Sequence, residues 1–277
     1  MSTSIAFIGG GNMATSLIGG LISSSASAAS IMVAEPDQVQ RSRLQQQFAV
    51  HTTADNSDTL NADVVILAVK PQLLQIVCRA LRETLNQSAR QPLFISIAAG
   101  VRSDDIDRWL GGDRVIVRAM PNTPSLLASG ATGLYANPRV SAAQKTVAET
   151  ILHAVGITLW VDKEDELDAV TAVSGSGPAY FFLLMEAMQQ AGVRLGLAPE
   201  TAEKLVIQTA LGAAQMAEHR ELDVATLRAQ VTSKGGTTEQ AINHFQQAGF
   251  EQLVESAMQA AYDRSRILAN ELGKDQS

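Results

Sequence analysis

Five short runs of β-branched and other apolar residues divide the first 160 residues at regular intervals. They are "SIAFIG" (4–9), "IMVAE" (31–35), "DVVILAV" (63–69), "LFISIA" (93–98) and "RVIVRAM" (114–120). The runs are mainly apolar rather than alternating, which is typical of parallel strands buried on both faces. Segments with helical spacing, such as 12–24 and 36–48, separate them, and 133–137 and 157–161 are candidates for further strands. Repeated strand–helix–strand units predict an α/β fold with a Rossmann-like doubly wound sheet.

From about residue 164 onwards the sequence changes character. No convincing strand follows, and two long alanine-rich stretches, 178–196 and 201–219, have helical spacing. Their apolar residues occupy more than one helical face, and such helices are normally buried in a bundle or against another subunit. We therefore predict an N-terminal α/β domain over 1–163 and an all-α C-terminal domain over 164–277 that forms a homodimer, within a larger homo-oligomer or alone.

Composition limits the partners and the compartment. The 277 residues carry a net charge of −7 and are 46% apolar, so neither a nucleic acid nor a membrane is expected as a partner. The longest apolar run, around 179–188, is cut by Glu186 and is too short to span a bilayer. Cys78 is the only cysteine, and the chain enters its first strand without a basic leader. These features predict a cytoplasmic protein with a buried structural thiol.

A glycine motif at the start of the chain predicts a dinucleotide site. Gly9, Gly11 and Ala14 follow the G-x-G-x-x-G/A pattern between a strand and a helix. Gly9 permits the tight turn, Gly11 lets a pyrophosphate approach the backbone, and Ala14 allows close helix packing. Glu35 follows 21 residues after Ala14, where an acid binds the ribose 2′-hydroxyl of NAD and repels a 2′-phosphate. A solvent-facing acid at a strand end is the alternative for Glu35.

Two further strand ends, "AVKP" (68–71) and "SIAAG" (96–100), are expected at the edge of the same cofactor crevice. Their small residues let a ligand lie close, although small residues at strand ends also serve plain packing. The four histidines are scattered, and no nucleophile triad or metal-ligand cluster is evident. The sequence therefore predicts no metal and a bound cofactor that carries the reaction.

A pair of glycines, Gly235 and Gly236, interrupts the helical half within "VTSKGGTTEQAINHF" (231–245). Each glycine weakens a helix by about 1 kcal/mol relative to alanine, which makes this stretch a poor helix interior. "TTEQ" (237–240) resembles a capping box and so predicts an N-capped turn between helices. Free amides at such a helix start also suit an anionic ligand. The residues alone leave both interpretations open.

Six motifs, in order along residues 4–270, resemble those of the pyrroline-5-carboxylate reductases. They are "AFIGGGNMA", "AVKPQ", "SIAAGV", "RAMPNTP", "DAVTAVSGSGPAYFF" and "VTSKGGTTEQAI". The glycine turn is shared with many nucleotide-binding proteins, whereas "SGSGPAY" and "TSKGGTT" are specific to this family. The resemblance implies reduction of L-1-pyrroline-5-carboxylate to L-proline, the last step of proline biosynthesis. NADP(H) is the implied hydride donor, with NAD(H) as a second choice.

The same resemblance implies a role for individual residues. Thr238 is implied as the catalytic residue, donating a hydrogen bond towards the ring nitrogen. "NTP" (122–124) and "SGSGP" (174–178) are implied to shape the pocket. The resemblance implies as substrate-binding residues Glu164, Ser233, Gly235, Gly236, Thr237 and Thr238. The expected cofactor-binding residues are Ile8, Gly9, Gly10, Gly11, Asn12, Met13, Glu35, Asn56, Ala68, Val69, Lys70, Pro71, Ile97, Ala98 and Ala99.

Two residues differ from the family pattern, and three alternative functions have to be considered. Lys234 stands where proline is commoner, and Glu35 where many relatives carry a smaller polar residue, which leaves the choice of cofactor undecided. A β-hydroxyacid dehydrogenase needs a lysine a few residues into the helix after its glycine turn, and none occurs here before Lys204. A reductase of another small cyclic imine differs only in substrate. A non-catalytic dinucleotide sensor would not need the intact "GGTT" turn.

Overall fold

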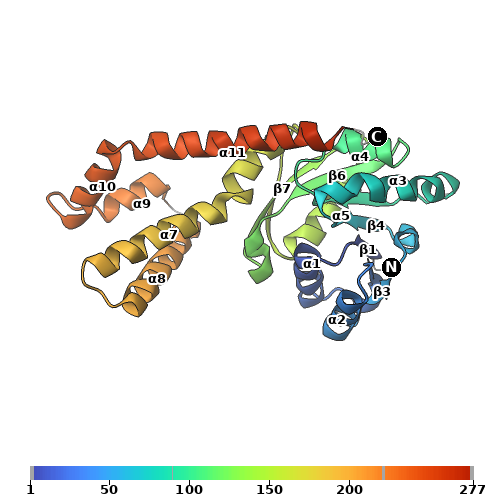
Figure 1. The fold of residues 1–277 in the computed structure, drawn as a ribbon, viewed down its shortest axis with the longest axis horizontal. Coiled ribbons are helices and arrows are strands. Elements are labelled where there is room, and N and C mark those ends of the chain that lie inside the picture. The colour runs from blue at the N-terminus through green and yellow to red at the C-terminus, as the bar shows by residue number, and fades with distance from the viewer. Residues whose placement is uncertain (1–2, 89, 220–221, 275–277) are drawn as a thin grey trace. The chain divides into compact units, whose positions relative to one another are not determined.

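The computed structural model describes residues 3–88, 90–219 and 222–274. The chain forms two compact units. Met1–Ser176 and Ala261–Ser277 make up unit 1, and Gly177–Ala260 make up unit 2. In Figure 1 the sheet of unit 1 and the helices beside it run from blue to green, and the helices of unit 2 from yellow to red. The predicted α/β half and the predicted helical half are both confirmed.

Unit 1 is built on one eight-stranded sheet with the strand order β3-β2-β1-β4-β5-β6-β7-β8. The strands are β1 (Ile5–Ile8), β2 (Ile31–Ala34), β3 (His51–Thr53), β4 (Val64–Leu67), β5 (Leu93–Ser96), β6 (Val115–Met120), β7 (Gly130–Ala136) and β8 (Gly156–Trp160). Strands β1 to β6 are mutually parallel, β7 is antiparallel to β6, and β8 is parallel to β7. The strand order reverses between β1 and β4. Open α/β sheets bind their ligands at the carboxyl ends of the strands beside such a switch point.

Helices cover both faces of this sheet (Figure 1). They are α1 (Asn12–Ser23), α2 (Gln38–Phe48), α3 (Pro71–Gln87), α4 (Ser103–Trp109) and α5 (Ala142–His153). Neighbouring residues of a strand point to opposite faces. Ile5 and Phe7 of β1 therefore pack with apolar side chains of α1, α2 and α5, whereas Ile8 packs with those of α3 and α4. Burial on both faces is the physical reason why the central strands β1, β2, β4 and β5 are mainly apolar.

The strand β3 was not expected from the sequence. Its three residues, His51 to Thr53, are polar and exposed or half-buried, and they lie at the edge of the sheet. Backbone hydrogen bonds to β2 hold this strand without an apolar run. The two candidate strands at 133–137 and 157–161 correspond to β7 and β8, which begin at Gly130 and Gly156.

The remaining elements of unit 1 are short. Three 3₁₀ helices, η1 (Ala28–Ser30), η2 (Asn56–Asn61) and η3 (Thr123–Leu127), lie in connections. Helix α6 (Glu166–Val170) continues into a π-helical turn, η4 (Thr171–Gly175). Residues from Ala261 onwards of α11 (Phe250–Leu272) also belong to unit 1, where Ser265 and Ala269 are buried. Unit 1 thus includes residues 164–176, and a domain division at 163/164 stays a prediction.

Unit 2 contains the helices α7 (Gly177–Arg194), α8 (Pro199–Glu218), α9 (Val224–Gln230) and α10 (Thr237–Gln247), together with the first part of α11. Among its described residues, the buried apolar side chains are only Ala202 and Val206. Phe181, Phe182 and Leu183 of α7 are each about two-thirds exposed. A helical unit with so small a core and so much exposed apolar surface requires a partner to cover it. Among the described helices, none is long and apolar enough to cross a membrane.

Cys78 provides a test of the packing beneath α3. Its side chain is completely buried, and burial raises the pKa of the thiol to about 12. Relative to a thiol with a pKa of 9, this lowers the thiolate fraction near neutral pH about a thousandfold. We expect Cys78 of the folded protein to react only slowly at pH 8 with a thiol reagent that acts by disulfide exchange. In denaturant, one thiol per chain should react. Rapid reaction of the folded protein would contradict the buried position.

Candidate functional site

The glycine turn between β1 and α1 fits its backbone surroundings closely. Gly9 has a φ of +98°, which favours glycine. A Cβ atom at Gly9 would lie 2.7 Å from the carbonyl oxygen of Ala68. The Gly9 amide donates to the Ala34 carbonyl at 2.8 Å, and the Ala68 amide donates to the Ile8 carbonyl at 2.8 Å. The end of β1 and the glycine turn are therefore bonded to the last residue of β2 and to the residue that follows β4.

Gly11 differs from Gly9 because it faces open space. It is the N-cap residue of α1, and a Cβ placed on it would meet no atom within 4 Å. No side chain caps this helix, and the amides of Asn12 and Met13 have no acceptor among the described residues. Unbonded first-turn amides and the positive end of the helix dipole form a favourable place for an anion. These residues therefore fit the pyrophosphate of a dinucleotide.

Glu35 lies against the same turn. One carboxylate oxygen accepts the Gly10 amide at 2.8 Å, and the other accepts the Asp37 amide at 3.1 Å. The Gln40 side chain donates to the Gly10 carbonyl at 2.5 Å from the first part of α2. Nη1 of Arg41 donates to the Glu35 carbonyl at 2.6 Å. Glu35 is thus held beside the glycine turn.

The other cofactor candidates end or follow neighbouring strands. Residues 68–71 follow β4, with Lys70 as the N-cap of α3 and Pro71 as its first residue. Residues 97–99 follow β5, and Asn56 begins η2 after β3. Because β1 to β5 are parallel and adjacent in the sheet, their carboxyl ends share one edge. The structure therefore gathers the cofactor candidates along one side of unit 1.

Glu164 has several partners within unit 1. Its Oε1 accepts the Ser103 amide at 2.6 Å and Nη1 of Arg118 at 2.8 Å, and its Oε2 accepts the Ser103 hydroxyl at 2.8 Å. The side chains of Arg118 and Glu164 are only 8% and 14% exposed. A buried ion pair with added hydrogen bonds anchors this segment to β6 and to the start of α4. The sequence analysis missed Arg118, although an arginine inside the apolar run 114–120 signals a buried acidic partner.

A second ionic group supports the same segment. Arg102 pairs with Asp165 and, at 3.2 Å, with Asp168. The Ser265 hydroxyl donates to Asp168 at 2.6 Å, so the end of α11 is bonded to α6. Burial lowers the pKa of Arg102, but the hydrogen bond to Asp165 and the charges of Asp165, Asp168 and Glu164 together raise it above the ordinary value.

The motifs expected to shape the pocket are bonded to each other. The Asn122 side chain donates to the Ser174 carbonyl at 3.0 Å and accepts the Ala131 amide at 2.9 Å. A Cβ atom at Gly175 would lie 2.5 Å from Cε of Met120, so this turn packs closely on the end of β6. "NTP" and "SGSGP" are therefore held together within unit 1.

The turn at 233–238 lies in unit 2, before α10. Gly235 has a φ of +75°, and a Cβ on it would meet no atom within 4 Å. Gly236 is the N-cap residue, and no side chain caps the helix in the manner expected for "TTEQ". The Glu239 carboxylate instead accepts the Gly235 amide at 2.7 Å. A capping box is therefore not formed at this turn.

The first turn of α10 has unused donors. The amides of Thr237 and Thr238 have no acceptor among the described residues, and neither does the Thr238 hydroxyl. Thr238 is half-buried, whereas Ser233 and Lys234 are exposed. These groups form an anion-binding helix start with an adjacent hydroxyl donor. Glu164 and all cofactor candidates belong to unit 1, and this turn belongs to unit 2.

The described residues contain no group of histidine, cysteine, aspartate or glutamate side chains arranged to hold a metal ion. The donors at both helix starts are amides and hydroxyls, which suit anions rather than cations. The chemistry of these sites is therefore that of binding and orienting charged organic molecules.

Comparison with known proteins gives consistent matches. Residues 164–268 match the family described as pyrroline-5-carboxylate reductase dimerisation, and residues 4–100 match the family described as NADP oxidoreductase, coenzyme F420-dependent. The chain is 55% identical to pyrroline-5-carboxylate reductase of Pseudomonas aeruginosa, over 98% of both chains. It resembles the solved pyrroline-5-carboxylate reductase of Coxiella burnetii, with 47% identity, a TM-score of 0.93 and coverage of 97% and 99% of the two chains. It also resembles the Plasmodium falciparum pyrroline carboxylate reductase solved with NADP bound, with 27% identity, a TM-score of 0.83 and coverage of 96% and 98%.

Proposed function

The chain belongs to the pyrroline-5-carboxylate reductase family, and from this premise we propose how its residues share the work of that reaction. It is an oxidoreductase that reduces L-1-pyrroline-5-carboxylate to L-proline with NAD(P)H, the last step of proline biosynthesis. When bound, the reduced nicotinamide supplies a hydride to the carbon of the C=N bond. The protein supplies binding, orientation and a hydrogen-bond donor. Oxidation of NAD(P)H with this substrate at neutral pH, compared with a six-membered cyclic imine, tests the reaction and its specificity.

The cofactor site that we propose is the edge formed by the carboxyl ends of β1 to β5. The amides of Asn12 and Met13 would hold the pyrophosphate, and Glu35 would contact the adenosine ribose. Asn56 would contact the same ribose from η2. Residues 68–71 and 97–99 would line the crevice beside the nicotinamide half. The open space at Gly11 is the observation that supports this assignment most directly.

The substrate site that we propose is the turn at 233–238. Its unbonded amides suit the substrate carboxylate, and the Thr238 hydroxyl would donate to the ring nitrogen. The open space at Gly235 would let the ligand approach the backbone. Glu164 remains a proposed substrate-side acid. Its contacts with Ser103 and Arg118 favour an additional anchoring role.

The protein is a homo-oligomer, and the exposed apolar faces of unit 2 supply the surface for it. We propose that a site combines the cofactor residues of one subunit with the 233–238 turn of another. This arrangement would explain why the two groups of candidate residues belong to different units of one chain. A single buried cysteine suits a reducing compartment, and we propose the cytoplasm.

Gly11→Val should weaken cofactor binding and leave the fold intact. The added side chain would enter open space in the folded protein, but it would occupy the place proposed for the pyrophosphate. We expect the Kd for NADPH to rise at least tenfold in a fluorescence titration, with an unchanged thermal midpoint in the absence of cofactor. Unchanged affinity would remove the glycine turn from the cofactor site. Gly9 is unsuitable for this test because its Cβ would strike the Ala68 carbonyl.

Glu35→Gln should raise the preference for NADPH over NADH. A like charge about 4 Å away costs about 1 kcal/mol in water and about 4 kcal/mol at an effective dielectric constant of 20. Because Glu35 is half-exposed, we expect the lower value, about a fivefold change in the ratio of the two kcat/KM values. Glutamine removes the negative charge but keeps an oxygen that can accept the Gly10 amide, so it tests the effect of the charge alone. Glu35→Ser would remove both the charge and this hydrogen bond. A shift towards NADH would place Glu35 away from the ribose.

A further inference from the structure

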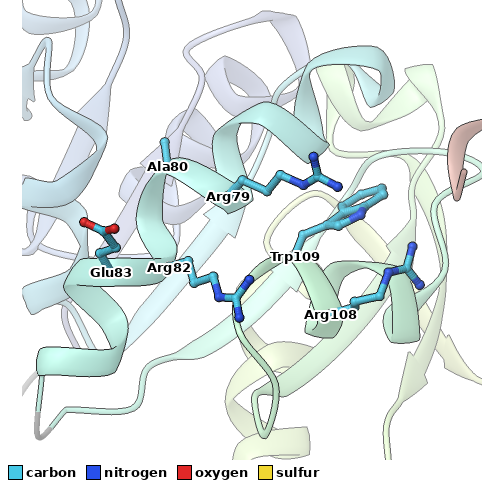
Figure 2. A pocket seen from close by; sticks show the side chains of 6 residues that line it. All are labelled: Arg79, Ala80, Arg82, Glu83, Arg108 and Trp109. Carbon is cyan, nitrogen blue, oxygen red and sulfur yellow. The ribbon is translucent and has the colours of Figure 1, made fainter. Parts of the chain in front are cut away.

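Several arginines of unit 1 are paired with carboxylates. In the pocket between α3 and α4 that Figure 2 shows, Nη1 of Arg108 lies 2.8 Å from Oδ1 of Asp105. Nη1 of Arg118, on β6, lies 2.8 Å from Oε1 of Glu164. Arg41, near the start of α2, is different, because it forms no ion pair with any of the described residues.

The acceptors of Arg41 are all uncharged. Its Nη1 donates to the carbonyls of Glu35 at 2.6 Å and Pro36 at 2.8 Å, and its Nη2 donates to the side-chain oxygen of Gln38. These bonds hold the half-buried guanidinium on the turn that follows β2, yet they leave its positive charge without a counter-ion. Its Nε has no acceptor among the described residues. An arginine that is already fixed loses little conformational entropy when it binds a ligand.

The surroundings of Arg41 are acidic. The amide of Glu35 donates to the carbonyl of Thr53 at 3.0 Å, so the turn after β2 lies beside the turn after β3. Arg41 is the only lysine or arginine within residues 31–42 and 51–61. The same two stretches contain four acids, which are Glu35, Asp37, Asp55 and Asp58. An anionic group that binds at this corner of the sheet is therefore repelled by several carboxylates and attracted by one guanidinium.

The start of α2 does not offer a second place for an anion. Asp37 is its N-cap residue, and the Asp37 carboxylate accepts the Val39 amide at 3.0 Å. A carboxylate of the chain itself thus occupies the helix start, where the amides and the helix dipole favour negative charge. Arg41 is therefore the group at this corner that can attract a further anion.

We propose that Arg41 admits the 2′-phosphate of NADPH and so decides, against Glu35, which cofactor the enzyme prefers. The inference rests on the proposed cofactor site, in which Glu35 contacts the adenosine ribose. In doubly wound folds, an acid after the second strand binds the 2′-hydroxyl of NAD, and an arginine nearby accommodates the 2′-phosphate of NADP. Nε and the remaining Nη2 proton of Arg41 supply donors for the phosphate oxygens. NADH carries no 2′-phosphate and gains nothing from Arg41.

The test compares NADPH with NADH, because these two ligands differ only in the 2′-phosphate. Fluorescence titration gives both dissociation constants for the full-length protein at constant ionic strength. We expect Arg41→Gln to raise the Kd for NADPH about tenfold and to change the Kd for NADH less than about twofold. Arg43→Gln is the matched control, because Arg43 is exposed and lies two residues further along α2, on another face. It should leave both constants unchanged.

Two more variants separate the charge of Arg41 from its support of the turn. Arg41→Lys keeps the charge, so it should bind NADPH more tightly than Arg41→Gln does. Equal NADPH affinity of these two variants would overturn the role of the charge. The double variant Glu35→Gln with Arg41→Gln removes one charge of each sign, so its ratio of the two constants should return towards that of the wild type. A double variant that disfavours NADPH as strongly as Arg41→Gln alone would contradict the opposition of the two charges.

Failure of this inference can be told apart from failure of the cofactor site. Gly11→Val should weaken NADPH and NADH alike, whereas Arg41→Gln should weaken NADPH alone. Unchanged binding of both cofactors in Gly11→Val would refute the cofactor site itself. An unchanged ratio of the two constants in Arg41→Gln, whether both cofactors bind as before or both bind more weakly, would refute the role of Arg41 and leave the site standing.

Discussion

Replacing Thr238 with alanine should lower turnover of pyrroline-5-carboxylate about 10- to 150-fold. A hydrogen bond to a group that gains charge contributes about 1.5–3 kcal/mol, which corresponds to this range of rates. Thr238 is half-buried at the start of α10, and its hydroxyl has no partner among the described residues. That hydroxyl is therefore free to bind the ring nitrogen. Steady-state kinetics at saturating NADPH measure the effect, and Thr238→Ser should recover most of the lost turnover.

Stability distinguishes this role from helix capping. If the Thr238 hydroxyl capped α10, the alanine variant would lose about 0.5–2 kcal/mol of folding free energy. Among the described residues no side chain caps α10, and alanine is a better helix former than threonine. We therefore expect unchanged or slightly raised stability in denaturant titrations at equal protein concentration. Wild-type turnover combined with lower stability would reduce Thr238 to a structural residue.

Mixing two weakly active variants should restore activity if sites are shared between subunits. In a heterodimer of Gly11→Val and Thr238→Ala subunits, one shared site carries both lesions and the other carries none. Random association makes half of the dimers heterodimers, so co-refolding of equal amounts should recover about a quarter of the wild-type activity. The assay needs NADPH below saturation, because only then does the weaker cofactor binding of the Gly11→Val subunit lower the measured rate. If each site were built within one chain, every site would keep one lesion.

Two controls make this result decisive. Differently tagged subunits, followed by native mass spectrometry, establish that exchange has taken place. Mixing each variant with itself gives the baseline, because refolding alone can change the active fraction. Activity no higher than the mean of the two separate variants, with exchange established, would discard the shared-site arrangement. The exposed phenylalanines of α7 would then need a covering partner that contributes nothing to the site.

The sequence by itself determined the elements whose signal is local. Parallel strands that are buried on both faces need apolar residues at most positions, so β1, β2, β4, β5 and β6 were visible as mainly apolar runs. The glycine turn was visible because a tight turn before a helix needs glycine at fixed spacing. The apolar faces of α7 and α8 indicated a partner, because one small helical unit cannot bury them.

Tertiary structure alone decided the features that depend on residues distant in sequence. The edge strand β3 is held by backbone hydrogen bonds to β2, and the pattern of its side chains does not predict them. The partners of Glu164 lie 61 and 46 residues away, at Ser103 and Arg118. At "TTEQ" the local pattern favoured a capping box with Thr237 as the N-cap, but the N-cap lies one residue earlier, at Gly236, and the amides of Thr237 and Thr238 have no acceptor among the described residues. Local sequence thus sets what each segment can form, and long-range contacts decide which groups remain free to act.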